Sequence, residues 1–133
     1  MTTTLIRGLG AGRIAFGAAM LLRPEQAVRG WIGPRAAAYG GTQVVTQAFG
    51  ARDLVLGAGS LAALAQGRDA RDWVAAGALC DLVDLVATVR GDDLPVGGRL
   101  AVVALAGAAI AVSAGYLTSD EPAVSGTVSS AAL

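Results

Sequence analysis

Histidine and lysine are absent from this sequence, and cysteine occurs once, at Cys80. Without histidine, the chain lacks the usual catalytic triads and the histidine-based metal sites. A single cysteine excludes an intramolecular disulfide and a cysteine-based zinc site. We therefore expect no metal ion and no cofactor, and the residue types point to no particular enzyme.

Charge is also scarce: 15% of the 133 residues are charged, and ten arginines balance ten acidic residues. A chain with no net charge is not an electrostatic nucleic-acid binder. Hydrophobic residues make up 54% of the sequence, which excludes a disordered polar chain. The length suits one domain. This composition is typical of an integral membrane protein, whose first partner is the lipid bilayer.

Four apolar stretches cover residues 5–22, 42–65, 73–89 and 100–117, with lengths of 18, 24, 17 and 18 residues. A helix needs about 20 residues to cross a bilayer. A soluble helical protein is the alternative, but its helices would carry a charged face opposite the apolar one, whereas these stretches are apolar nearly all round. We predict an all-α protein, with an antiparallel four-helix transmembrane bundle in residues 1–117 and a flexible tail at 118–133.

The segment 23–41 connects the first two stretches. Pro24 suits the first turn of a helix, Glu25 suits the positive end of a helix dipole, and Trp31 suits the level of the lipid headgroups. The segment therefore predicts a short helix at the membrane interface.

The arginines outside the apolar stretches are unevenly distributed. The first and third connections carry five of them, Arg23, Arg29, Arg35, Arg90 and Arg99, whereas the second carries Arg68 and Arg71. Cytoplasmic loops are enriched in arginine, so the first and third connections are predicted to be cytoplasmic. This describes a multi-pass protein of the cell (inner) membrane with both termini outside.

Five charged residues lie near the middle of the first three stretches: Arg13, Arg52, Asp53, Asp81 and Asp84. At a rise of about 1.5 Å per residue, each lies within roughly 5 Å of the centre of its stretch. A charge in hydrocarbon costs about 2.5–3.5 kcal/mol on insertion scales, so we expect these side chains to face inward and pair. They form the candidate intramembrane polar network.

Small residues flank these charges at helical spacings. Gly10 and Gly17 share a face with Arg13, and Gly77 shares one with Asp81. Gly8 and Gly12 form a further pair of small residues at the spacing that favours close helix packing. The sequence therefore predicts close helix contacts beside the charged residues.

The polar network is not balanced unless Arg7 belongs to it. Two arginines face three aspartates, so without Arg7 one aspartate is left to be protonated, or to bind a cation or a polar ligand. With Arg7, three residues of each sign lie inside the predicted spans. The position of Arg7 therefore separates a closed structural network from one with a carboxylate to spare.

Two segments resemble a known family: Phe49-Gly-Ala-Arg-Asp-Leu-Val-Leu-Gly57 and Gly77-Ala-Leu-Cys-Asp-Leu-Val-Asp84. They are similar to the signature segments of the small membrane proteins grouped as domain of unknown function 4267, which are distantly similar to DoxX-like proteins. The resemblance covers roughly residues 5–117. It implies a four-helix transmembrane bundle with characteristic polar residues at 52, 53, 81 and 84, and it implies no activity.

Three functions remain open at this stage. The first is a non-enzymatic accessory or structural component of a membrane, acting as a homo-oligomer or within a larger complex. The second is a proton- or ion-coupled carrier of a small solute that uses Asp81 and Asp84. The third is a membrane enzyme acting on a lipid or quinone, with an aspartate as acid or base. A closed network favours the first, a water-filled cavity the second, and a lipid-sized apolar cavity beside the carboxylates the third.

Overall fold

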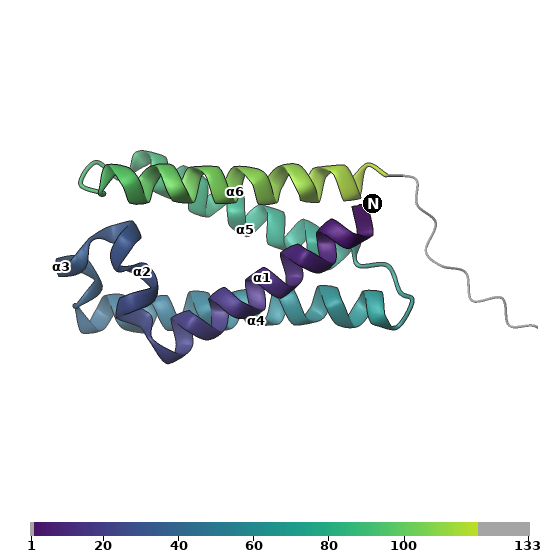
Figure 1. Ribbon diagram of the computed structural model, residues 1–133, viewed down its shortest axis with the longest axis horizontal. Helices are drawn as coiled ribbons and strands as arrows, with labels where there is room; N and C mark the ends of the chain where they lie inside the picture. The colour runs from purple at the N-terminus through teal and green to yellow at the C-terminus, as the bar shows by residue number, and fades with distance from the viewer. Residues whose placement is uncertain (1, 120–133) are drawn as a thin grey trace, which may run out of the picture.

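The computed structural model describes residues 2–119, and all regular structure within that range is helical (Figure 1). The six helices are α1 (Thr2–Leu22), α2 (Pro24–Ile32), α3 (Pro34–Ala37), α4 (Gly40–Ala65), α5 (Arg71–Arg90) and α6 (Val96–Leu117). The all-α prediction is confirmed for this part of the chain. Most of the tail predicted at 118–133 lies outside the described residues.

Proline and glycine determine where the first helices begin and end. Pro24 occupies the first turn of α2, where its missing N–H is not needed and its fixed φ suits the helix. Gly33 has a φ of +87°, which glycine adopts without strain, and it separates α2 from α3. The segment predicted as one short helix therefore forms two.

Within residues 2–119, three helices are long and apolar enough to cross a membrane: α1, α4 and α6. No more than 33% of the apolar window in any of them is buried within the protein, so most of their residues are at least partly exposed. These features support a membrane protein. Residues 73–89, predicted as a fourth span, lie within α5, which is not among these three because it carries more charged residues, Asp81 and Asp84 among them.

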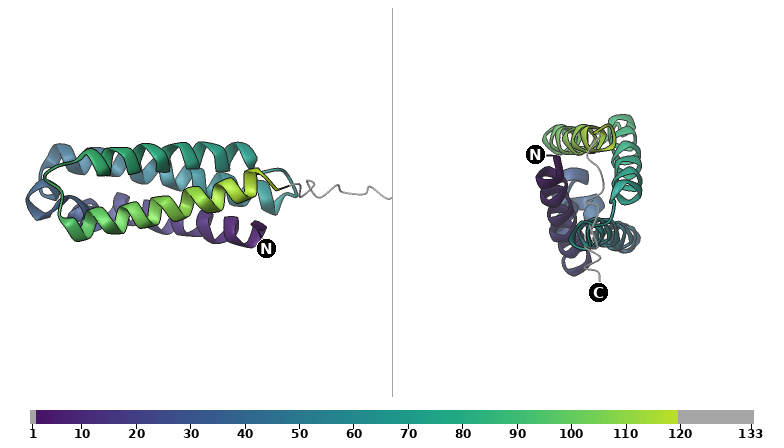
Figure 2. Two further views of the ribbon diagram at one scale, coloured as in Figure 1. Left: turned by 90° about the horizontal axis from the view of Figure 1, so that it is seen from above. Right: turned by 90° about the vertical axis from the view of Figure 1, so that its right-hand side faces the viewer.

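The four long helices run in alternating directions. Seen end on, they lie in the order α1, α4, α5, α6 around the molecule (Figure 2). Helices α2 and α3 lie at one end together with the connection from α5 to α6, and the start of α1 and the connection from α4 to α5 lie at the other end (Figure 1). The five arginines of the first and third connections are thus at one end of the molecule.

Glycines bring α1 and α4 into direct backbone contact. A Cβ atom at Gly17 would lie 2.5 Å from the carbonyl oxygen of Gly50, and one at Gly57 would lie 2.5 Å from that of Gly10. Gly10 and Gly17 are seven residues apart on α1, and Gly50 and Gly57 are seven apart on α4. Seven residues make about two helical turns, so each helix presents its two glycines on one face. This contact makes α1 and α4 a tightly packed pair.

Helices α5 and α6 form the second pair, which meets the first mainly at the two ends. At one end, Ile6 of α1 and Tyr116 of α6 belong to one buried apolar cluster with Ala63, Ala70 and Val74. At the other end, a Cβ atom at Gly98 of α6 would lie 2.7 Å from Cα of Trp31. Between these ends, the two pairs are joined by charged side chains.

Candidate functional site

Arg13 lies at the centre of a buried group of charges. Its Nη1 atom lies 3.4 Å from Oδ1 of Asp53 on α4, and its Nη2 atom forms a close ion pair with Oδ2 of Asp81 on α5. Only 9% of the Arg13 side chain is exposed. A single arginine of α1 therefore contacts carboxylates on both α4 and α5.

Arg52 extends the group toward Asp84. Its Nη2 and Nη1 atoms donate to the two carboxylate oxygens of Asp84 at 2.8 and 3.4 Å, which is the forked geometry that arginine forms with carboxylates. The same Nη2 lies 3.2 Å from Oδ1 of Asp53. The Phe49 ring lies against this guanidinium, with its centre 5.0 Å from Cζ.

The result is a chain of alternating charges in the order Asp81, Arg13, Asp53, Arg52 and Asp84. We call these five residues the Arg–Asp network. Gly77 gives it room, because a Cβ atom there would lie 3.0 Å from Nη2 of Arg13. Three of its four ionic contacts join side chains of different helices, so the network connects α1, α4 and α5 in the middle of the molecule.

Arg7, which was considered as a sixth member of the network, lies outside it. Its side chain is exposed on α1, and none of the ion pairs found among residues 2–119 includes it. A residue on the outer side of α1 cannot turn toward Asp53 or Asp81 without rotating the helix and removing Arg13 from the interior. The network therefore contains three carboxylates and two guanidinium groups.

Two carboxylate oxygens have capacity to spare. Oδ1 of Asp53 and Oδ2 of Asp81 accept from arginine, whereas Oδ2 of Asp53 and Oδ1 of Asp81 accept no hydrogen bond from residues 2–119. The two side chains are only 9% and 12% exposed. An incoming donor would therefore find two acceptor atoms in a largely dry environment.

A cavity of about 420 Å³ lies beside the network. All five charged residues line one part of it, and apolar side chains and glycines line the rest: Gly8, Leu9, Gly12, Phe16, Met20, Trp31, Phe49, Val102, Leu105, Ala106 and Ala109. The volume falls within the range of about 300–1,000 Å³ that is usual for ligand sites, which also combine apolar walls with a few polar groups.

The sequence did not indicate two parts of this lining. Gly8 and Gly12 were interpreted as a packing pair, but both are exposed and a Cβ atom at either would meet nothing within 4 Å. Helix α6 supplies no residue to the Arg–Asp network, yet its Leu105 and Ala106 form part of the wall. The uncharged residues 100–117 gave no signal of this role.

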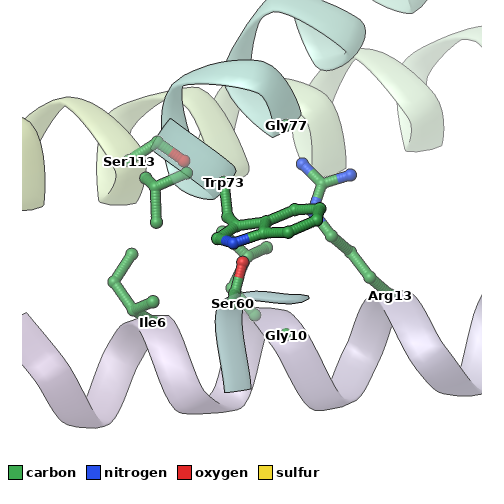
Figure 3. A pocket seen from close by; sticks show the side chains of 9 residues that line it. Ile6, Gly10, Arg13, Ser60, Trp73, Gly77 and Ser113 are labelled. Atoms are coloured by element: carbon green, nitrogen blue, oxygen red, sulfur yellow. The ribbon is translucent and has the colours of Figure 1, made fainter. Parts of the chain in front are cut away.

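A second cavity of about 10 Å³ lies between α1 and the start of α5 (Figure 3). Ser113 and Ile6 lie on one side of Trp73, and the Arg13 side chain lies on the other. The Ser60 hydroxyl donates to the Leu56 carbonyl oxygen at 2.8 Å, whereas the buried Ser113 hydroxyl has no hydrogen-bond partner among residues 2–119. The space suits about one water molecule at most, so it is not a ligand site.

The described residues contain no group of three or more histidine, cysteine, aspartate or glutamate side chains that could hold a metal ion. The chain matches no protein-family model, no curated protein and no solved structure. The Arg–Asp network and the cavity are therefore the features that bear on its function.

Proposed function

We propose that this chain is a four-helix integral membrane protein that binds a membrane-dissolved amphiphile in the cavity beside the Arg–Asp network. The ligand has an apolar body and an end group that donates hydrogen bonds or carries a positive charge. The proposal rests on one observation: all five network residues and a set of apolar residues line the same cavity of about 420 Å³.

The proposal treats α5 as a fourth membrane-spanning helix. Asp81 and Thr88 are buried, whereas the exposed face of α5 consists of apolar side chains: Leu79, Leu82, Val83, Val86 and Val89. A helix with this distribution presents hydrocarbon to the lipid and its polar groups to the interior. The family resemblance favours the same four-helix arrangement.

The membrane orientation is also part of the proposal. The five arginines of the first and third connections lie at the end that contains α2 and α3. The enrichment of arginine in cytoplasmic loops supports placing this end in the cytoplasm and both termini outside the cell membrane.

The chemistry of the end group follows from the charge balance. With three carboxylates, two guanidinium groups and two oxygens that accept nothing from the described residues, the network favours a donor or a cation over an anion. An amine or a hydroxyl fits this requirement, and a ligand carboxylate would be repelled.

The alternatives from the sequence are distinguished by the cavity. A structural component needs the ion pairs but not the space beside them. An ion-coupled carrier needs the space to admit water, whereas this lining is predominantly apolar. A lipid-modifying enzyme would use the same cavity, and conversion of a bound ligand would reveal it. Binding without conversion is the function that we propose.

The test uses the two tryptophans. In a Trp73→Phe background, Trp31 is the remaining tryptophan, and it lines the cavity. The protein in lipid nanodiscs is titrated with 11-bromoundecylamine, whose bromine quenches tryptophan fluorescence on contact. The proposal predicts saturable quenching that undecylamine reverses by competition. Quenching that rises in proportion to the amount of bromide in the bilayer, without competition, would contradict it.

A further inference from the structure

We propose that the ligand enters the cavity sideways from the bilayer, through an opening between α1 and α6. This opening is bordered by Gly8, Gly12 and Phe16 on α1 and by Leu105 on α6, and we call it the α1–α6 opening. The inference rests on the proposed function and adds to it the route and the physical state of the ligand, which arrives dissolved in hydrocarbon.

The four bordering residues line the cavity and are also exposed. Gly8 and Gly12 are exposed, and Phe16 and Leu105 have 45% and 71% of their surfaces exposed. Residues 8, 12 and 16 are four apart, so they lie above one another on a single face of α1. Exposed residues in the lining of a cavity mark the place where it opens to the exterior.

The α1–α6 boundary is closed at both ends but not in the middle. Toward the start of α1, Ile6 and Tyr116 belong to one buried cluster. Toward the other end, α1 runs away from α6 and α2 lies between them (Figure 1), with Trp31 packed near Gly98. Leu105 is the tenth of the 22 residues in α6, so the opening faces the middle of the bilayer.

The other boundaries of the cavity have contacts across them near the network. Glycine contacts bring α1 against α4, Arg52 of α4 is paired with Asp84 of α5, and α5 packs along the length of α6. The α1–α6 boundary is therefore the one through which a molecule can pass with the least rearrangement.

The chemistry of the opening selects what can use it. Its border consists of two glycines, an aromatic ring and a leucine, with no charged side chain. An ion or a strongly hydrated solute would lose its water there without a polar group to replace it. An alkyl chain would lose nothing, and an amine that enters in its neutral form would meet the Arg–Asp network once inside. The small size of Gly8 and Gly12 is what keeps this border open.

The first experiment narrows the opening and measures the rate of entry. Gly12→Phe adds a ring where a Cβ atom meets nothing within 4 Å, and Gly115→Phe is the matched control because Gly115 is exposed on α6 and equally free of neighbours. In the Trp73→Phe background, stopped-flow quenching by 11-bromoundecylamine should show entry slowed at least tenfold in Gly12→Phe and unchanged in Gly115→Phe. Entry at the parental rate in Gly12→Phe would overturn the route.

A second measurement needs no ligand and so separates the route from the proposed function. A spin label attached at Gly12→Cys, in a Cys80→Ala background, reports collisions with oxygen, which concentrates in hydrocarbon, and with a water-soluble nickel chelate. We expect high accessibility to oxygen and low accessibility to nickel. High accessibility to nickel would overturn the lateral route even if the parent protein binds the bromide. Absence of saturable quenching in the parent protein would instead refute the proposed function.

Discussion

Arg13 and Asp81 are 68 residues apart in the chain and form a buried ion pair between α1 and α5. The pair connects the two tightly packed helix pairs at the middle of the molecule. Asp53, which also contacts Arg13, belongs to α4, so a single guanidinium holds three helices together. The stability of the fold and the polar side of the cavity therefore depend on the same side chain.

Replacing Arg13 should be the most damaging change to any single arginine. Arg13→Gln leaves Asp53 and Asp81 buried without a full counter-charge, and breaking a buried ion pair in this way costs about 3–5 kcal/mol. Equilibrium unfolding in detergent micelles measures the loss of folding stability. The matched control is Arg7→Gln on the same helix, which should change the free energy of unfolding by no more than about 0.5 kcal/mol because Arg7 is exposed. Equal effects of the two substitutions would contradict the network.

The same substitution at two glycines of α1 should change the stability of the protein in opposite directions. Gly17→Ala places a Cβ atom 2.5 Å from the Gly50 carbonyl oxygen, and overpacking of this kind costs about 1–3 kcal/mol. Gly12→Ala meets nothing within 4 Å and should stabilise the helix by up to about 1 kcal/mol. Thermal unfolding of the two variants side by side tests the assigned faces of α1, and a stabilising Gly17→Ala would show that α1 and α4 are farther apart.

The buried hydroxyl of Ser113 should be dispensable. It has no hydrogen-bond partner among the described residues, and removing an unpaired buried polar group relieves a desolvation cost of about 1–3 kcal/mol. Ser113→Ala should therefore leave stability unchanged or raise it, as measured by thermal unfolding. A loss of more than about 1 kcal/mol would show instead that the hydroxyl is satisfied, for example by a water molecule in the 10 Å³ cavity.

The membrane orientation predicts which connections are accessible from each side. In a Cys80→Ala background, Arg29→Cys should react with a membrane-impermeant maleimide only after the membrane is opened, because α2 is proposed to be cytoplasmic. Arg68→Cys lies in the connection from α4 to α5 and should react in intact cells. Labelling of both sites in intact cells would contradict a protein with alternating spans, and the reverse pattern would invert the orientation.

The charged residues could be found from the sequence because hydrocarbon constrains them so strongly. A charge at that depth has to face inward and find a partner, so Arg13, Asp53 and Asp81 could be proposed as neighbours without knowledge of the helix packing. The depth of a residue does not give its direction, however. Arg7 lies in the same stretch as Arg13, and it points outward.

The cavity could not be found in the same way, because it depends on how α1 crosses the other helices. Gly8 and Gly12 have the composition and spacing of a packing pair, as Gly10 and Gly17 do, and only the contacts with α4 decide which pair is buried. Those contacts involve Gly50 and Gly57, about 40 residues away in the chain. The role of α6 as a wall follows from the same crossing and has no local signal in the uncharged residues 100–117.

The most direct test of the central claim is the preference of the cavity for one end group over another. Binding of 11-bromoundecylamine and of 11-bromoundecanoate is compared by Trp31 quenching in the Trp73→Phe protein and in the same protein with Asp81→Asn. If the Arg–Asp network receives the polar end of the ligand, the parent should bind the amine at least tenfold more tightly than the carboxylate, and Asp81→Asn should bring the ratio close to one. A ratio that is the same in both proteins would show that the network and the binding site are separate.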